Sequence, residues 1–223
     1  MKMLYERVYE RHEIAELLGT NTRQGIHRKL NGYGVFHLIE GRGEHFTVNI
    51  KRITDPFKVF CVLDLDFPAQ TDFKKLREFY WYYFNDDEFK AMPDEVKEGR
   101  MRDNGRTLTR QTIATYTHKL LQKEYINPNI GNYIYYFACK GTQTMTDEAT
   151  YKKAWREYWE DKEEGAGSYE AIDKMVCKYG GYARKQPVPE ENVFYLKELL
   201  YLQDLIGKGI EDDYATDNFK SDI

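Results

Sequence analysis

The sequence predicts an α+β chain, mostly helical, in which a unit of helix, turn, helix and β-hairpin occurs twice ahead of a helical C-terminal part. The pattern Thr-Arg-Gln-x-Ile occurs at residues 22–26 and again at residues 109–113. Apolar residues at helical spacing follow each copy, and strand-like alternating runs come after them. The expected organisation is a first unit over residues 1–53, a second over 54–145 and a helical extension over 146–223.

The first unit is expected to hold two short helices joined by a tight turn. In RHEIAELLGT the apolar residues fall at i, i+3 and i+4, and Gly19 supplies a C-terminal stop. Asn21 or Thr22 then caps a second helix in which Ile26 and Leu30 share the core face. The following VFHLIEGRGEHFTVNI alternates around a Gly-Arg-Gly tip, which predicts a β-hairpin with a basic turn.

Helix, short turn, helix and hairpin is the order of a winged helix-turn-helix. The segment EIAELLGTNTRQGIHRKL resembles that bacterial and phage DNA-binding superfamily, and the resemblance covers roughly residues 8–52. It implies a winged fold that binds duplex DNA, and the repeated pattern extends this expectation to tandem winged units.

The second unit repeats the order more loosely. DDEFKAMPDEVKEGRMRD predicts a helix that enters after Pro93, Asn104-Gly105 predicts a turn, and Thr109 is expected to cap the next helix. Two short β-like runs are expected around residues 129–132. Because Thr, Arg and Gln are all favourable near helix starts, chance recurrence of the pattern is the alternative to homology.

Two elements are expected between the repeats. KVFCVLDLDF (residues 58–67) predicts a strand, and TDFKKLREFYWYYF (residues 71–84) predicts a helix capped by Thr71. The six consecutive aromatic residues that end this helix favour a core or interface position. Stacking on unpaired bases is the alternative role for them.

Residues 146–223 are expected to be all-helical. Tyr151, Trp155 and Trp159 form a stripe at i, i+4 and i+8, and YEAIDKMVCKYGGY predicts a second short helix. PEENVFYLKELLYLQDLI opens with a proline and acids, which is typical of a helix start. This part is expected to pack back on the winged units or to pair with a second copy in a homodimer.

The net charge of −4 conceals a gradient along the chain. Residues 1–53 hold nine Lys or Arg and six Asp or Glu, residues 54–145 hold thirteen of each, and residues 146–223 hold eleven and eighteen. The three net charges are therefore +3, 0 and −7. An anionic partner is expected to meet the N-terminal part.

The residues expected to contact DNA lie mainly in the first unit. An Arg or Gln near the start of a recognition helix can form bidentate contacts with guanine or adenine, and basic residues on the hairpin suit phosphates. The candidates here are Arg23, Gln24, His27, Arg28, Arg42, Lys51 and Arg52. A solvated helix face in a winged domain that binds protein is the alternative.

The second unit offers a weaker set of candidates: Arg106, Arg110, Gln111, Thr115 and His118. Arg100 and Arg102 belong to the same basic cluster. Acidic residues are interleaved with these arginines, so internal ion pairs are the alternative. The expected hairpin NPNIGN also has no Lys or Arg, and DNA contact by this unit is therefore less favoured than by the first.

No catalytic, metal or cofactor site is expected. Asp64 and Asp66 would share one face of the predicted strand and could hold Mg²⁺. However, no phosphate loop, catalytic lysine motif, nucleophile elbow or HExxH accompanies them. An exposed strand end or a salt bridge to Lys58 or Lys74 is favoured over metal binding.

The resulting expectation is a duplex-DNA-binding transcriptional regulator from a bacterium or a mobile element such as a phage. Two alternatives stay open: a plasmid or phage replication initiator, and an anti-CRISPR-like inhibitor in which the −7 segment imitates nucleic acid and blocks an enzyme. Three widely spaced cysteines without a CxxC motif favour a reducing cytoplasm. No run is apolar enough for a membrane span, and the charged N-terminus does not read as a signal peptide.

Overall fold

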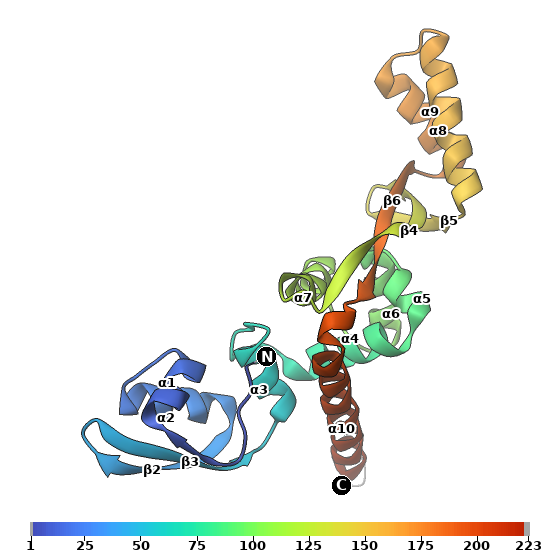
Figure 1. The fold of residues 1–223 in the computed structure, drawn as a ribbon. Coiled ribbons are helices and arrows are strands. Elements are labelled where there is room, and N and C mark those ends of the chain that lie inside the picture. The colour runs from blue at the N-terminus through green and yellow to red at the C-terminus, as the bar shows by residue number, and fades with distance from the viewer. Residues whose placement is uncertain (1, 221–223) are drawn as a thin grey trace. The chain divides into compact units, whose positions relative to one another are not determined.

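A computed structural model describes residues 2–220, of which residues 129, 130 and 212–220 are described only by their backbone. The chain is an α+β fold, 55% helical and 23% strand, with two small antiparallel sheets. This confirms the predicted class at that level (Figure 1). The chain divides into two compact units: unit 1 comprises Met1–Trp81 and Tyr195–Ile223, and unit 2 comprises Tyr82–Phe194.

Unit 1 opens with two helices and a three-stranded sheet. Its first elements are β1 (Val8–Glu10), α1 (Arg11–Leu18), α2 (Arg23–Tyr33), β2 (Val35–Arg42) and β3 (His45–Ile53). The Thr22 hydroxyl accepts a hydrogen bond from the backbone N–H of Gly25, and Gly19 ends α1 in the left-handed conformation. The two predicted helices, the Thr22 cap and the hairpin are therefore confirmed.

The sheet of unit 1 has the order β1-β3-β2 and is antiparallel. One of its faces packs on α1 and α2, where Ile26, Leu30 and Val48 are fully buried. Strand β1 was not predicted, because three residues are too few to show an alternating pattern. It forms through its pairing with β3, a contact between segments about forty residues apart.

The strand predicted over residues 58–67 is wrong, because the segment forms helix α3 (Pro56–Leu63). A short apolar run fits a buried helix as well as a strand. The deciding signals come before it: the Asp55 carboxylate accepts from the N–H of Lys58, and Pro56 occupies the first turn. Asp64 ends the helix and Asp66 has a left-handed backbone (φ 55°), so these carboxylates do not share a strand face.

Helix α4 (Phe73–Asn85), which belongs to unit 1 as far as Trp81, and helix α10 (Leu196–Lys220) complete the core of unit 1. The aromatic run of α4 is largely core, since Phe79 and Tyr80 are fully buried, and base stacking by these two rings is therefore excluded. Asp72, rather than the predicted Thr71, accepts from the N–H of Lys75 at the helix start.

Helix α10 belongs to unit 1 although it lies more than 100 residues further along the chain. It contacts α3, and its side chains Leu199, Leu202, Leu205 and Ile206 are buried. Leu196 and Leu200 point outward and are about half exposed. The C-terminal helix therefore packs back on the N-terminal part, which was one of the two arrangements expected for it.

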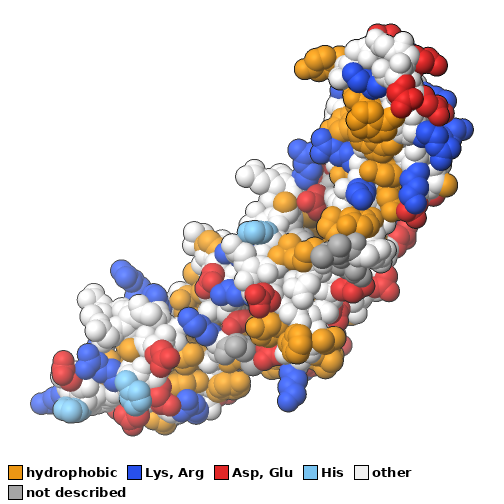
Figure 2. Space-filling model, turned by 45° about the horizontal axis from the view of Figure 1, so that its top comes forward, with side chains coloured by type: hydrophobic (Ala, Val, Ile, Leu, Met, Phe, Trp, Pro, Cys, Tyr) orange, Lys and Arg blue, Asp and Glu red, His pale blue; other side chains and the backbone are white. Residues whose placement is uncertain are grey.

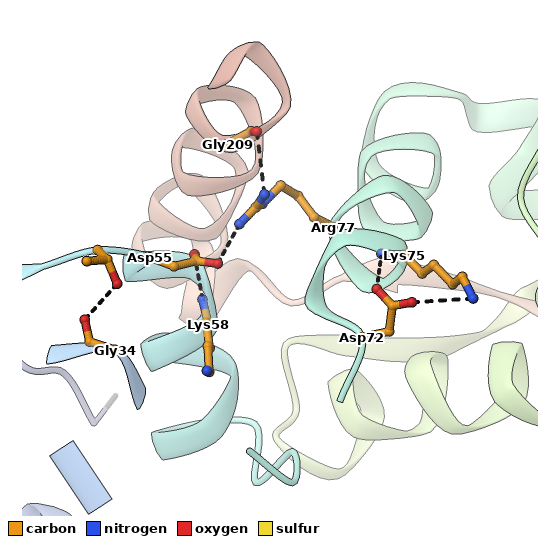
Figure 3. Close-up of polar contacts among 8 residues, drawn as sticks. Gly34, Asp55, Lys58, Asp72, Lys75, Arg77 and Gly209 are labelled. Carbon is orange, nitrogen blue, oxygen red and sulfur yellow. Dashed lines mark hydrogen bonds and ion pairs between the residues drawn. The ribbon is translucent and has the colours of Figure 1, made fainter. Parts of the chain in front are cut away.

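Arg77 of α4 ties these helices together (Figure 3). Its guanidinium donates to the Asp55 carboxylate at 2.8 Å and to the Gly209 carbonyl of α10 at 3.4 Å. It also lies over the Phe57 ring at 5.0 Å. Arg77 thus connects the start of α3 to α10 at a position where its own side chain is almost fully buried.

Unit 2 combines a helical part with a second sheet of order β5-β4-β6. Its elements are α5 (Asp87–Ala91), α6 (Asp94–Asp103), α7 (Arg110–Gln122), β4 (Ile126–Cys139), β5 (Thr142–Thr146), α8 (Glu148–Glu163), α9 (Ser168–Tyr179) and β6 (Tyr182–Glu191). A short 3-10 turn, η1 (Val193–Tyr195), leads into α10. The Thr109 hydroxyl accepts from the N–H of Thr112, which confirms the predicted cap of α7.

Two predictions about the second sheet are wrong. The chain turns at Lys140-Gly141, both with positive φ, rather than around residues 129–132, which lie within β4. The predicted all-helical part also contains β6, whose ten residues pair with β4, so the helix expected near Pro189 starts only at Leu196. Pairing with a long strand outweighs the local helix-start signals, and Pro187 and Pro189 fit β6 because it is an edge strand.

Candidate nucleic-acid interface

One face of α2 is open and polar. Gln24, His27, Arg28 and Asn31 are exposed and fall at i, i+3, i+4 and i+7, so they share one side of the helix. Ile26 on the opposite side is fully buried. In this copy of the repeated pattern the threonine caps the helix and the isoleucine lies in the core. The polar side chains between them therefore stay on the surface.

Arg23 is not free on this surface. Its guanidinium donates to the backbone carbonyls of Gly41 and Ile39, both at 2.8 Å. These carbonyls lie on β2, which is an edge strand of the sheet. Arg23 therefore joins the first residue of α2 to the hairpin and occupies two edge acceptors that would otherwise be open to another strand.

Two histidines continue the contact between α2 and β2. His27 Nδ1 lies 2.9 Å from His37 Nε2, and Asn31 Nδ2 lies 3.1 Å from His27 Nε2. His37 Nδ1 lies 2.9 Å from the Val35 carbonyl, which can only accept. With both rings neutral, these distances fit one directed chain, in which Asn31 donates to His27, His27 donates to His37 and His37 donates to Val35.

A shallow groove of about 560 Å³ runs between α2 and β2. Its lining residues are Arg23, Gln24, His27, His37, Leu38 and Ile39. Arg23 is the one residue of this lining that carries a fixed charge, and its guanidinium is held by the two carbonyls. The groove therefore offers Gln24 and the imidazoles as hydrogen-bonding groups.

The hairpin carries the remaining basic candidates. Arg42 is exposed at the end of β2, and Arg28 is exposed on α2; neither forms an ion pair within residues 2–220. Gly41 has φ 100°, and a Cβ there would lie 2.3 Å from the His45 carbonyl, so glycine is required. Arg52 pairs with Phe36 across the strands and lies on the sheet face that points away from α2.

The equivalent part of unit 2 is internally paired. Arg110 at the start of α7 lies 3.7 Å from Glu95 of α6, and its backbone N–H donates to Glu98 at 2.9 Å. Arg102 pairs with Glu98 at 3.3 Å and Arg100 with Asp86 at 3.5 Å. The alternative of internal ion pairs is thus what the geometry shows for these arginines.

The other candidates of unit 2 form no second basic surface. Gln111, Thr115 and His118 are exposed on α7, and the Thr115 hydroxyl donates to the Gln111 carbonyl. Arg106 is half-buried and has its own interaction partner. A groove beside the start of α7 is lined by Asp94, Glu95 and Glu98 as well as by Arg102 and Arg110. Such a mixed surface attracts a polyanion less than the α2 face does.

Charges of both signs are interspersed on the face of the molecule that Figure 2 shows, and hydrophobic side chains gather toward the α8–α9 hairpin. The lysines of that hairpin are partly neutralised, since Lys174 pairs with Asp161 at 2.7 Å and Lys178 with Glu157 at 2.8 Å. The −7 segment is also divided between the two units.

Sequence reasoning missed two members of the α2 surface, Asn31 and His37. Asn31 follows His27 by one helical turn, and this spacing was the available signal for it. The position of His37 opposite His27 depends on how β2 packs beside α2, which no local pattern reports.

No protein-family model, no curated protein and no solved structure matches this chain. Over the described part of the chain, none of the helices has the length and apolarity needed to cross a membrane. Within the same residues, no three His, Cys, Asp or Glu side chains cluster in a way that could hold a metal ion.

Proposed function

We propose that the chain binds duplex DNA through unit 1, with α2 as the recognition helix and the β2–β3 hairpin as the wing of a winged helix-turn-helix. The observation that supports this most is the open α2 face, where Gln24 and Arg28 are exposed opposite a fully buried Ile26. A helix of this kind can enter the major groove, where Gln contacts adenine and Arg contacts guanine or phosphate.

In this proposal Arg23 has a different task from the one the sequence suggested. Because two carbonyls hold its guanidinium, it fixes the wing relative to the recognition helix rather than reading bases. Gln24 reads bases, while Arg28 and Arg42 contact phosphates. Transcriptional regulation is the use we favour, and initiation of plasmid or phage replication is the alternative.

The order of α6, α7 and the β4–β5 hairpin supports a second winged unit in the same chain. We assign it a supporting role, because its arginines at the helix start are paired with Glu95 and Glu98. Protein contact is the use that such an internally neutralised surface favours.

This proposal is tested in two steps. Fragments that the protein binds are selected from random duplex DNA, and the selected DNA is then titrated with the protein at several salt concentrations. Arg28→Ala and Arg42→Ala should each weaken binding to all sequences and reduce the salt slope by about 0.9. Arg110→Ala is the matched control in unit 2 and should change neither quantity. A salt dependence that is flat in the unmodified protein would remove the basis of the proposal.

A deletion separates DNA binding from imitation of nucleic acid. Deleting the whole acidic segment, residues 146–223, would remove α10 from the core of unit 1. A smaller deletion is therefore needed to test the segment without unfolding unit 1. Replacing only residues 147–181, which hold six Lys or Arg and nine Asp or Glu, by a short Gly-Ser linker spares both sheets. DNA affinity should stay the same or rise, whereas an inhibitor that imitates nucleic acid through α8 and α9 would lose its target enzyme.

A further inference from the structure

The outer face of the unit 1 sheet, which points away from α1 and α2, carries three large exposed apolar side chains. Val8 and Leu38 lie in one row across the sheet, on either side of Asn49, and they are 51% and 52% exposed. Phe36, two residues before Leu38 on the edge strand, is 60% exposed. Single exposed apolar residues are ordinary, but neighbouring ones on a flat sheet face indicate a contact surface.

Charged residues of opposite sign lie at the two ends of this face. Glu10 and Glu40 both lie opposite Thr47 at one end. Arg52 lies opposite Phe36 at the other end, and the bulge in β3 leaves the exposed Lys51 beside it. Thr47 and Arg52 are five residues apart on β3, which corresponds to about 16 Å.

The basic end also holds Glu6, whose carboxylate accepts a hydrogen bond from the N–H of Ile53 at 3.0 Å, so this end has two cations and one anion and stays net basic. Glu40, Lys51 and Arg52 form no ion pair with any residue of the described part of the chain. A face with an acidic end, an apolar middle and a basic end is complementary to itself when one copy is turned end over end. That is the requirement for an isologous interface, in which both partners use the same patch.

We propose that this sheet face binds the same face of a second copy of the chain. The two-fold axis runs between the two sheets and across the strands, so the strands of the two copies run in opposite directions. Arg52 and Lys51 of one copy then face Glu40 and Glu10 of the other, while Phe36, Leu38 and Val8 pack in the middle. An axis parallel to the strands would instead place like charges together.

The expected homodimer is thereby assigned to the N-terminal sheet instead of the C-terminal helix. Most of the apolar face of α10 is already buried within unit 1, as Leu199, Leu202 and Leu205 show. The outer face of the sheet packs on nothing in unit 1 that covers Val8, Phe36 or Leu38. This assignment does not depend on DNA binding.

Sedimentation velocity of the full chain without DNA, over the micromolar concentration range, tests the proposal. The protein should dimerise, and Leu38→Ser should weaken the dimer at least about tenfold, because it removes an apolar side chain from the centre. Glu40→Lys or Arg52→Glu should weaken it to a similar degree by juxtaposing like charges. Glu16→Lys, at an exposed position on α1, is the control and should leave the dimer unchanged.

The decisive variant combines Glu40→Lys with Arg52→Glu. Because each copy supplies both residues, the double exchange restores opposite charges across the two-fold axis and should recover the dimer to within a few-fold. Melting temperatures of all variants verify that they fold. A chain that stays monomeric at every concentration overturns the proposal. The proposal is also overturned if these substitutions leave the dimer affinity unchanged while Leu200→Ser dissociates the dimer, because the contact would then lie on α10.

Discussion

The guanidinium of Arg23 donates a hydrogen bond to the carbonyl of Gly41 at 2.8 Å, and this contact joins the first residue of α2 to the hairpin 18 residues later. The second donor of the same side chain reaches Ile39. A charge-assisted bond to a backbone carbonyl fixes position, and two such bonds turn both terminal nitrogens of the Arg23 guanidinium toward β2. Its neighbour Gln24 lies exposed on the open face of α2.

We therefore expect Arg23→Ala and Gln24→Ala to differ. Arg23→Ala should lower the stability of unit 1 by about 0.5–1.5 kcal/mol and loosen the hairpin, because it removes two hydrogen bonds whose acceptor carbonyls are then solvated by water. Gln24→Ala should leave stability unchanged and reduce discrimination between DNA sequences by about 1–3 kcal/mol. Thermal melting and binding to the selected DNA measure the two effects, and an Arg23→Ala protein with unchanged melting and lost specificity would reverse the roles.

The histidine pair makes a prediction about tautomers. His37 should carry its proton on Nδ1, which faces the Val35 carbonyl, and His27 should also carry its proton on Nδ1, which faces His37. Nitrogen chemical shifts of the neutral rings distinguish this arrangement from the Nε2–H form. The exposed His118 of α7 is an internal reference. An Nε2–H proton on His37 would contradict the directed chain.

Replacing the repeated isoleucine by a carboxylate should unfold each unit separately. Ile26 and Ile113 are both 0% exposed, so Ile26→Asp and Ile113→Asp each bury an unpaired charge at a cost of about 4 kcal/mol or more. Gln24→Asp and Gln111→Asp, at exposed positions of the same helices, are the matched controls. Hydrogen exchange resolved by segment should show lost protection in the unit that carries the change. Unchanged melting of either variant would mean that the repeated pattern does not mark a core helix.

The closeness of Arg77 to Gly209 predicts that this glycine cannot be replaced. A Cβ at Gly209 would lie 2.4 Å from Arg77 Nε, so Gly209→Ala displaces the buried guanidinium that also binds Asp55. We expect a loss of about 2 kcal/mol despite the better helix propensity of alanine. Gly32→Ala in α2 has open space around its new methyl group and should gain about 0.5–1 kcal/mol. Equal melting of the two variants would argue against the Arg77 contact.

Lys97 of α6 is 2% exposed, and burial lowers its pKa although Asp94, with its carboxylate 3.8 Å away, acts in the opposite direction. A lysine pKa below its unfolded value of 10.5 means that the unfolded chain binds this proton more tightly. The free energy of unfolding therefore rises with pH from the folded pKa up to that value.

Lys97→Met should remove this alkaline rise, because the group that releases its proton between the folded and the unfolded pKa is no longer present. Burial raises the pKa of Tyr83, which lowers stability at still higher pH in both proteins, so the comparison is made below the pH at which an unfolded tyrosine ionises. Lys153→Met, at an exposed position on α8, is the control. A pH profile identical to that of the unmodified protein would show that Lys97 is hydrated.

The sequence by itself determined the elements whose signals are local. Thr22 and Thr109 cap the helices they precede, and Ile26 and Ile113 are buried as their spacing indicates. The hairpin of unit 1 and helices α8 and α9 were predicted for the same reason, since a cap, a glycine stop or an amphipathic stripe acts within a few residues.

Only the tertiary structure decided the elements that depend on distant partners. Strand β1 forms because it pairs with β3, and β6 forms because it pairs with β4. Neither segment has a local sequence pattern that predicts a strand. The apolar run of α3 suits a strand and a helix equally, and its packing against α2 and α10 is a tertiary contact that the local sequence does not report. The sequence placed Arg23 on a recognition helix. Its hydrogen bonds to Gly41 and Ile39 form only when the hairpin folds beside α2, because the register of the sheet brings those two carbonyls to the guanidinium.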